Sequence, residues 1–154
     1  MAADRSYVTK NREQLDRLRA LVDKLSDQEL TKPMEAGWTV AAVLAHLAFW
    51  DYRIVTLLDR WNAGGTPPSS IDESHVDWIN DAGKPLCLAL PPRVAARTAV
   101  EAAVAADQRV AALTEAQLEA NMKSGSPIST LRAEHRREHL DEIEQKLKGR
   151  RGSP

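Results

Sequence analysis

The sequence predicts an all-α protein built as a four-helix bundle with one long crossover connection. Three observations support this fold class. Apolar residues recur at steps of three and four along most of the 154-residue chain. No segment shows the two-residue alternation of a β-strand. A stretch rich in Pro and Gly, residues 62–92, separates the second long helical segment from the third.

The first helix is predicted over residues 8–25, because apolar side chains form one stripe and charges fill the other positions. The stripe consists of Val8, Leu15, Leu18, Val22 and Leu25. Ser26 and Glu29 then have the spacing of a capping box, which predicts a short helical turn. Pro33 and Gly37 interrupt the chain before the next long element.

The second helix is predicted from Thr39, as N-cap, to about Trp61, with Trp38 and Val43 as a hydrophobic staple. Asn62-Ala-Gly-Gly65 ends it. Residues 62–92 should form a long structured crossover with no more than a short helical turn around Glu73–Asn80. Connections of that length in a compact domain are usually functional or disordered.

The third helix is predicted to follow Pro92 and to run through an Ala-rich stretch to Leu113, where the alanines allow a neighbouring helix to approach closely. The fourth is predicted to begin between Pro127 and Thr130 and to end near Lys148. Residues 1–148 thus form one bundle domain, and residues 149–154 a flexible C-terminal tail.

A short internal repeat fits two related halves. Leu25-Ser-Asp-Gln-Glu-Leu30 and Leu113-Thr-Glu-Ala-Gln-Leu118 share a capping pattern, and each precedes a loop and a His-bearing helix. Such an arrangement would place both His-bearing segments at similar heights in the bundle. Independent use of the same capping chemistry explains the pattern equally well.

Composition excludes several classes of protein. The formal net charge is −1, which argues against an electrostatic nucleic-acid binder, and Cys87 is the only cysteine, which excludes a disulfide framework and a multi-cysteine metal site. No apolar run approaches the roughly 18 residues of a membrane span, and the N-terminus has no signal-peptide core. We therefore expect a cytoplasmic protein without membrane or nucleic-acid partners.

Histidines carry the candidate chemistry. His135 and His139 are four residues apart, so on a helix their side chains lie one above the other and one metal ion can bridge them. On a helical wheel they fall on the side of Ile128 and Leu131, and His46 lies at the margin of its own apolar stripe. Three imidazoles on two helices that meet in the bundle could hold one ion, with coordination positions left open for water or substrate.

Other interpretations remain open at this point. His46 could be a hydrogen-bonded structural residue, and the His135 pair could lie on a solvated charged face. Glu138 and Glu142 could orient the histidines or act as a general base, or they could form surface ion pairs with Arg136, Arg137 or Lys146. His75 is predicted to be a surface or pocket-rim residue.

The chain resembles the DinB-like metalloenzymes, which include the N-terminal domains of mycothiol-dependent maleylpyruvate isomerases. The resemblance rests on Gly37-Trp-Thr-Val-Ala-Ala-Val-Leu-Ala-His46-Leu with Trp50-Asp51, on Val76-Asp-Trp-Ile-Asn80, and on the closing His135-Arg-Arg-Glu-His139 motif. It also includes the Leu-Ser-Asp-Gln-Glu-Leu turn, and it spans nearly the whole chain in order.

The resemblance implies an up-down-down-up bundle holding one divalent metal ion, zinc or nickel, with His46, His135 and His139 as ligands. It further implies an S-transferase that joins a low-molecular-weight thiol, of the mycothiol or bacillithiol type, to an electrophile in detoxification. The extra C-terminal domain of the isomerase has no counterpart here, which favours a stand-alone transferase. In this interpretation Cys87 is a small apolar residue and not the nucleophile.

Substrate contacts are expected from Trp50, Arg53, Trp78 and Asn80. Two alternatives to a transferase remain: a metal-dependent hydrolase or resistance protein on the same scaffold, and a non-catalytic binding bundle. Exposed apolar positions on the first and third helices would suit a homodimer.

Overall fold

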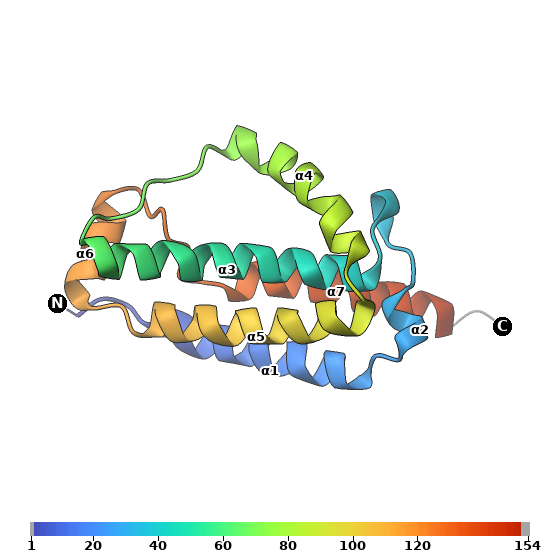
Figure 1. Cartoon of the computed structure of the whole chain (residues 1–154). Coiled ribbons are helices and arrows are strands. Elements are labelled where there is room, and N and C mark those ends of the chain that lie inside the picture. Colours follow the sequence, from blue (N-terminus) through green and yellow to red (C-terminus); the bar gives the residue numbers. More distant parts are fainter. Residues whose placement is uncertain (1, 152–154) are drawn as a thin grey trace.

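The computed structural model describes residues 2–151, and the regular secondary structure of that part of the chain is helical throughout. Four long helices form the bundle: α1 (Ser6–Lys24), α3 (Val40–Gly64), α5 (Pro92–Ala111) and α7 (Ala133–Arg151). Figure 1 shows α1 and α7 running in one direction and α3 and α5 in the other. The prediction of an all-α fold is confirmed.

Short helices connect the long ones. They are α2 (Asp27–Leu30), η1 (Glu35–Gly37), η2 (Glu73–His75), α4 (Val76–Ala89) and α6 (Glu115–Lys123). The predicted helix starts are confirmed at Ser26 and Thr39, whose side chains each accept a backbone N–H of the following turn. Thr114 forms the same kind of cap at the start of α6. Gly65 ends α3 in the left-handed conformation, at φ +71°, which glycine adopts without strain.

The crossover differs from its prediction. The sequence predicts at most a short turn around Glu73–Asn80, whereas α4 continues as a helix to Ala89 through Gly83 and Pro85. Gly and Pro normally interrupt a helix, and here tertiary contacts override that preference. Asn80 accepts a hydrogen bond from Trp50 Nε1 on α3, at 2.8 Å, and Lys84 donates to the Ala36 carbonyl.

The structure also corrects the prediction for the last third of the chain. A separate helix, α6, follows Thr114, and α7 begins at Ala133 and not between residues 127 and 130. Buried Asn11 on α1 accepts the Ala133 N–H and so fixes this start. Ile128 and Leu131 therefore lie in a loop, and their placement on the helical face of the histidines was wrong. The helix α7 includes Gly149 and ends at Arg151. The predicted boundary between the bundle and the tail, at residue 149, therefore falls inside this helix. Residues 152–154 of the predicted tail lie outside the described residues.

Around the bundle, α5 packs closely along α3 and also along α1, and α1 packs along α7. The side of α5 that faces the core is almost entirely alanine, which brings the helix backbones together as predicted (Ala95, Ala96, Ala99, Ala102, Ala103 and Ala106 are buried). Only a short stretch of α3 approaches α7 closely. The seam between α3 and α7 is therefore wide enough for large polar side chains.

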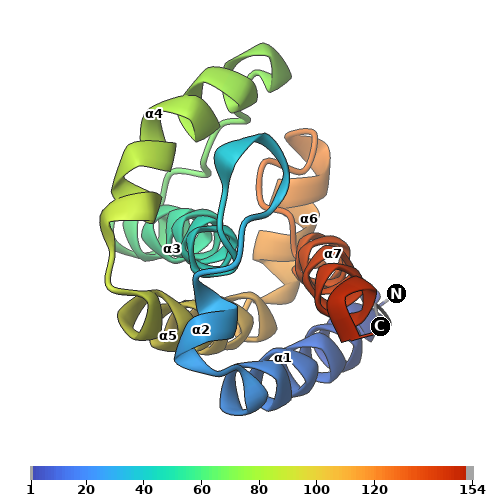
Figure 2. The same ribbon diagram turned by 90° about the vertical axis from the view of Figure 1, so that its right-hand side faces the viewer.

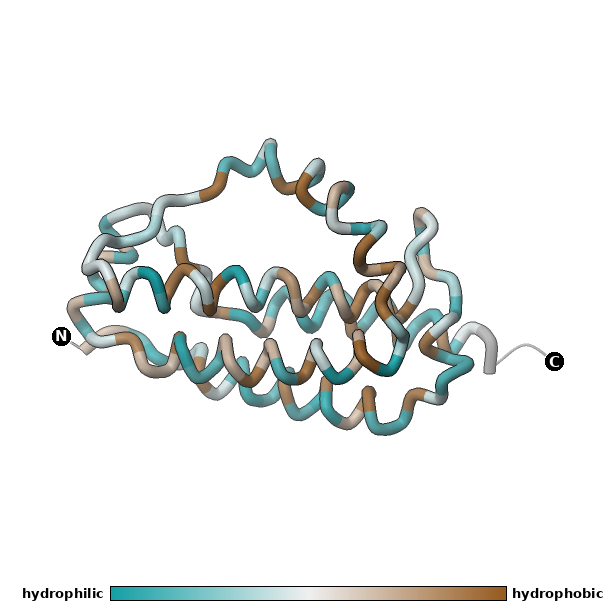
Figure 3. The backbone as a smooth tube through the Cα atoms, in the orientation of Figure 1, coloured by the Kyte–Doolittle hydropathy of each residue, from teal (hydrophilic) through white to brown (hydrophobic). Residues whose placement is uncertain are grey.

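By length and composition α3 could cross a membrane. The sequence analysis, which considered only uninterrupted apolar runs, predicts no segment of that kind. In the folded protein its apolar residues form the core, and 56% of its most apolar stretch is buried against other parts of the chain. Figure 3 shows the helices with mixed hydrophilic and hydrophobic positions, as amphipathic bundle helices have. This is the pattern of an amphipathic helix packed into a protein core.

Candidate metal centre

Three histidines meet in the seam between α3 and α7. His46 comes from the first half of α3, and His135 and His139 occupy successive turns of α7. His135 Nε2 lies 3.2 Å from His46 Nε2 and 3.2 Å from His139 Nε2. All three ligand atoms lie within 4.8 Å of one another. The rings are steeply inclined to one another, and the short separations between their nitrogens bring the three ligand atoms together.

These separations fit one divalent ion. Two nitrogens that bind the same tetrahedral ion at about 2.0–2.1 Å lie about 3.3 Å apart. The two 3.2 Å separations around His135 are close to that value. The donor set, three imidazoles, is one that zinc and nickel accept.

Glu142 sets the tautomer of one ligand. Its Oε2 lies 3.1 Å from His139 Nδ1, one turn further along α7. A carboxylate at that position accepts the Nδ1–H, which leaves the Nε2 lone pair free for a metal. The sequence predicts Glu138 and Glu142 equally for this role, but Glu138 is exposed and has no such contact with a histidine.

Burial keeps two of the imidazoles neutral. It lowers the pKa of His46 to about 4, with a smaller contribution from His139. It lowers the pKa of His135 to about 3, and the neighbouring His139, His46, Arg132 and Arg136 add to this effect. A neutral imidazole has the lone pair that a metal ligand needs, so both residues are ready to bind at neutral pH.

The metal-free protein should lose stability as the pH falls. The ordinary His pKa of 6.5 holds in the unfolded chain, whereas the folded values are about 4 and 3, so between these limits the unfolded chain binds more protons. Stability therefore declines as the pH falls through 6.5 toward 4. Thermal unfolding at a series of pH values, in excess chelator, measures this change in stability. The variant His46→Gln/His135→Gln should show a flatter pH dependence, and an equal slope would contradict this explanation.

A buried charge network fixes α7 beside His135. Arg132 donates to Asp51 at 2.9 Å, and Arg136 pairs with Asp107 at 2.6 Å and with Asp51 at 3.4 Å. Arg136 is only 1% exposed, which corrects its prediction as a surface ion-pair partner. The network joins α7 to α3 and α5, so it sets the register that brings His135 opposite His46. The sequence signal for this network was Asp51, an aspartate within the apolar run of α3.

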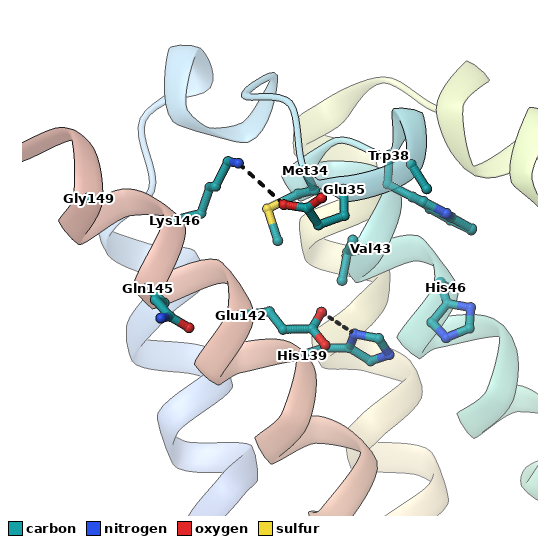
Figure 4. Close-up of a pocket in the computed structure, with 11 residues that line it drawn as sticks. Met34, Glu35, Trp38, Val43, His46, His139, Glu142, Gln145, Lys146 and Gly149 are labelled. Carbon is teal, nitrogen blue, oxygen red and sulfur yellow. Dashed lines mark hydrogen bonds and ion pairs between the residues drawn. The ribbon is translucent and has the colours of Figure 1, made fainter.

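A cavity of about 850 Å³ adjoins the histidines. Figure 4 shows its walls: Met34, Trp38 and Val43 on one side, and Glu142, Gln145 and Lys146 from α7 on the other, with His46 and His139 at its inner end. Lys146 and Glu35 form an ion pair across it, at 3.7 Å. A cavity of this volume accommodates a small organic substrate.

Residues 33–39 form one wall of the cavity, and the sequence did not predict them as part of the site. Gly37 and Ala36 both have positive φ, of +81° and +54°, and this turn directs Trp38 edge-on to the His46 ring, with ring centres 5.6 Å apart. Lys84 from α4 holds the turn through the Ala36 carbonyl. Gly37 next to Trp38 was the available signal, but the sequence predicts only a helix staple there.

The four predicted substrate contacts do not line this cavity. Trp50 and Asn80 bond to each other and connect α3 to α4, and Arg53 lies over the Trp50 ring. Trp78 is 56% exposed on α4. Their role as substrate contacts stays a prediction. His75 is exposed beside Trp78, outside the cluster, and Cys87 packs half-buried against the core, which raises the pKa of its thiol.

Comparison with known families identifies the scaffold. The family described as the DinB superfamily matches residues 11–142, which contain all three clustered histidines. Comparisons with curated proteins and with solved structures gave no significant match. The match spans most of the chain, and the fold is all-helical as the resemblance implied. The chain therefore belongs to the DinB superfamily.

Proposed function

We propose that this protein is a divalent-metal-dependent enzyme, with zinc or nickel bound by His46, His135 and His139. We further propose that it transfers a low-molecular-weight thiol, of the mycothiol or bacillithiol type, to an electrophile. One observation carries the proposal: three imidazoles converge within 4.8 Å, and two of them, His46 and His139, line a cavity of about 850 Å³. Three protein ligands with adjacent open space are typical of a catalytic metal site, whereas structural sites are closed.

A divalent ion held there would supply Lewis acidity and lower the pKa of a thiol or water that coordinates it. The chain's own residues do the rest. Glu142 orients His139, and the apolar wall of Met34, Trp38 and Val43 excludes water from one side of the cavity. Lys146 and Gln145 offer polar contacts on the opposite side.

The nucleophile must then come from the cosubstrate. Cys87 does not line the cavity, and burial raises the pKa of its thiol, which disfavours the reactive thiolate. A thiol cosubstrate is the remaining source of sulfur, and it reaches the histidines from the cavity. Transfer forms a carbon–sulfur bond to the electrophile and releases its leaving group, while the thiol proton passes to solvent.

The test is thiol consumption by the metal-loaded protein. Zinc- or nickel-loaded protein is incubated with an alkyl halide in the presence and absence of mycothiol, bacillithiol or cysteine, and the adduct is measured by mass spectrometry. A thiol-dependent adduct that is lost in His139→Ala and kept in His75→Ala supports the proposal. Turnover of the electrophile without any thiol would favour a hydrolase, and no turnover with any thiol would contradict the transferase.

Glu142→Ala should lower metal affinity by about 10- to 100-fold, the usual effect of removing a carboxylate that orients a metal-binding histidine. Glu138→Ala is the matched control, because it removes an exposed carboxylate from the same helix without a contact to the histidines. Competition with a chromogenic chelator measures both affinities. Equal affinities in the two variants would show that Glu142 does not orient His139.

A further inference from the structure

One wall of the cavity beside the histidines follows α7. His139, Glu142, Lys146 and Gly149 all line it, and because they are spaced by three and four residues they lie on one side of the helix. Lys146 comes seven residues after His139, which places its Cα about 10 Å further along the helix axis. A ligand that extends from the histidines toward the outer part of the cavity therefore passes beside Lys146.

Lys146 gives this wall a positive charge. It is the only lysine or arginine among the described residues that line the cavity, and the wall opposite carries the apolar side chains of Met34, Trp38 and Val43. Figure 4 shows the Lys146 ammonium directed across the cavity toward the segment that contains Met34 and Glu35. An ammonium close to apolar surface attracts an anion more strongly than it does in open water.

A carboxylate of the protein already faces this ammonium. Glu35 Oε1 lies 3.7 Å from Lys146 Nζ, which is longer than a hydrogen bond, and the Glu35 side chain is 95% exposed. Glu35 belongs to the segment between α2 and α3, which Figure 2 shows at the end of the bundle between α4 and α7. Water screens such an exposed pair, so it contributes little. A carboxylate on a ligand can therefore replace Glu35 at small cost.

We propose that the cavity binds a substrate with an apolar body and a terminal carboxylate, and that Lys146 recognises this carboxylate. The inference rests on the proposed function, in which the other end of the substrate reaches the histidines. The carboxylate then lies on the order of 10 Å from the reacting atoms. Lys146 determines specificity and takes no part in the reaction, and Glu35 competes with the ligand for the ammonium.

The charges in the cavity favour a carboxylate over a phosphate. Glu142 lies one turn before Lys146 on α7, and Glu35 lies opposite, so a group with two negative charges would meet repulsion from both. Phosphate sites normally provide an Arg fork or several backbone N–H groups at a helix N-terminus. The cavity is lined by the C-terminal half of α7, whose helix dipole does not attract anions. One ammonium is suited to one carboxylate.

The first experiment measures binding of 6-phenylhexanoate and of its uncharged amide by calorimetry. The full chain is used in excess chelator, so that the carboxylate cannot coordinate an ion. Lys146→Met should weaken binding of the acid by about tenfold, the usual effect of losing a hydrogen bond to a charged group, and leave the amide unchanged. Lys148→Met is the matched control, because Lys148 lies on the same helix but lines a different cavity, with Leu21 and Leu25.

Glu35→Gln should change the affinity in the opposite direction. It removes the competing carboxylate, so the acid should bind more tightly while the amide is unaffected. If the Lys146–Glu35 pair only closed the cavity, loss of either partner would have the same effect. Effects of the same sign in the two variants, or equal affinities of the wild type for acid and amide, would overturn the proposal. Circular dichroism verifies that both variants are folded.

The second experiment identifies which substrate carries the carboxylate. Zinc-loaded protein receives 8-mercaptooctanoate with an uncharged alkyl halide, or an uncharged thiol with 4-(bromomethyl)phenylacetate. A rise in KM with unchanged kcat in Lys146→Met, for the acidic thiol or for the acidic halide, assigns the carboxylate to that substrate. No rise for either would contradict the proposal. Absence of turnover, with the acid still preferred over the amide in chelator, would contradict the proposed function and leave carboxylate recognition by Lys146 in place.

Discussion

His135→Ala is expected to abolish stoichiometric metal binding. His135 Nε2 is the atom that lies 3.2 Å from both other ligand nitrogens, so its loss leaves His46 and His139 without the central donor. Metal affinity should fall by about 100-fold or more, beyond the loss typical of an orienting neighbour. Metal content by mass spectrometry of tag-free protein, together with titration of the metal-free form, measures the effect.

His75→Ala is the matched control for this substitution. It removes an exposed histidine that has no contact with the cluster, and it should keep one ion per chain. Metal should also raise the Tm of the wild type and of His75→Ala, since a ligand at 100 times its Kd stabilises the folded state by about 2.7 kcal/mol. Equal metal content in the His135 and His75 variants would refute the site.

Asp51→Ala is expected to have the largest effect on folding, a loss of about 3–5 kcal/mol in the free energy of unfolding. Asp51 is 3% exposed and pairs with both Arg132 and Arg136. Without it, buried Arg132 loses its carboxylate partner and Arg136 keeps only Asp107. An uncompensated buried charge is far more costly than the loss of a surface pair. Urea unfolding of the metal-free proteins measures the change.

Asp59→Ala is the control from the same helix. Asp59 pairs with Arg109 at 2.8 Å, but both side chains are exposed, so its loss should cost less than about 1 kcal/mol. If the buried network also sets the register of α7, Asp51→Ala should weaken metal binding under conditions in which it remains folded, and Asp59→Ala should not. A small unfolding effect for Asp51→Ala would mean that the arginines find other partners or water.

Local signals in the sequence were enough for the starts of α2 and α3, and the capping pattern at Thr114 was also visible. Ser26, Thr39 and Thr114 each accept a backbone N–H within three residues, and such a cap depends only on the residues beside it. The His135 and His139 pair was predictable for the same reason, since a spacing of four on a helix places two side chains together. The pairing with His46 was expected from two apolar faces that had to meet in the bundle.

Where long-range contacts outweigh local preference, prediction failed. Gly83 and Pro85 indicate a loop, yet α4 is helical because Asn80 and Lys84 bond to distant residues. The start of α7 depends on Asn11, more than a hundred residues away. The cavity wall at Trp38 depends on a turn held by Lys84, and no local pattern reveals that contact.

The sequence by itself determined the helical class, the caps and the residues able to bind a metal, because these follow from periodicity and side-chain chemistry within a few turns. Only the tertiary structure decided that Arg136 is buried and that the cavity opens beside His139 and not beside Asn80. It alone decided that Trp78 and Leu86 of α4 are exposed. Each of these depends on which distant segment covers a given face, and that choice is made by packing of the whole chain.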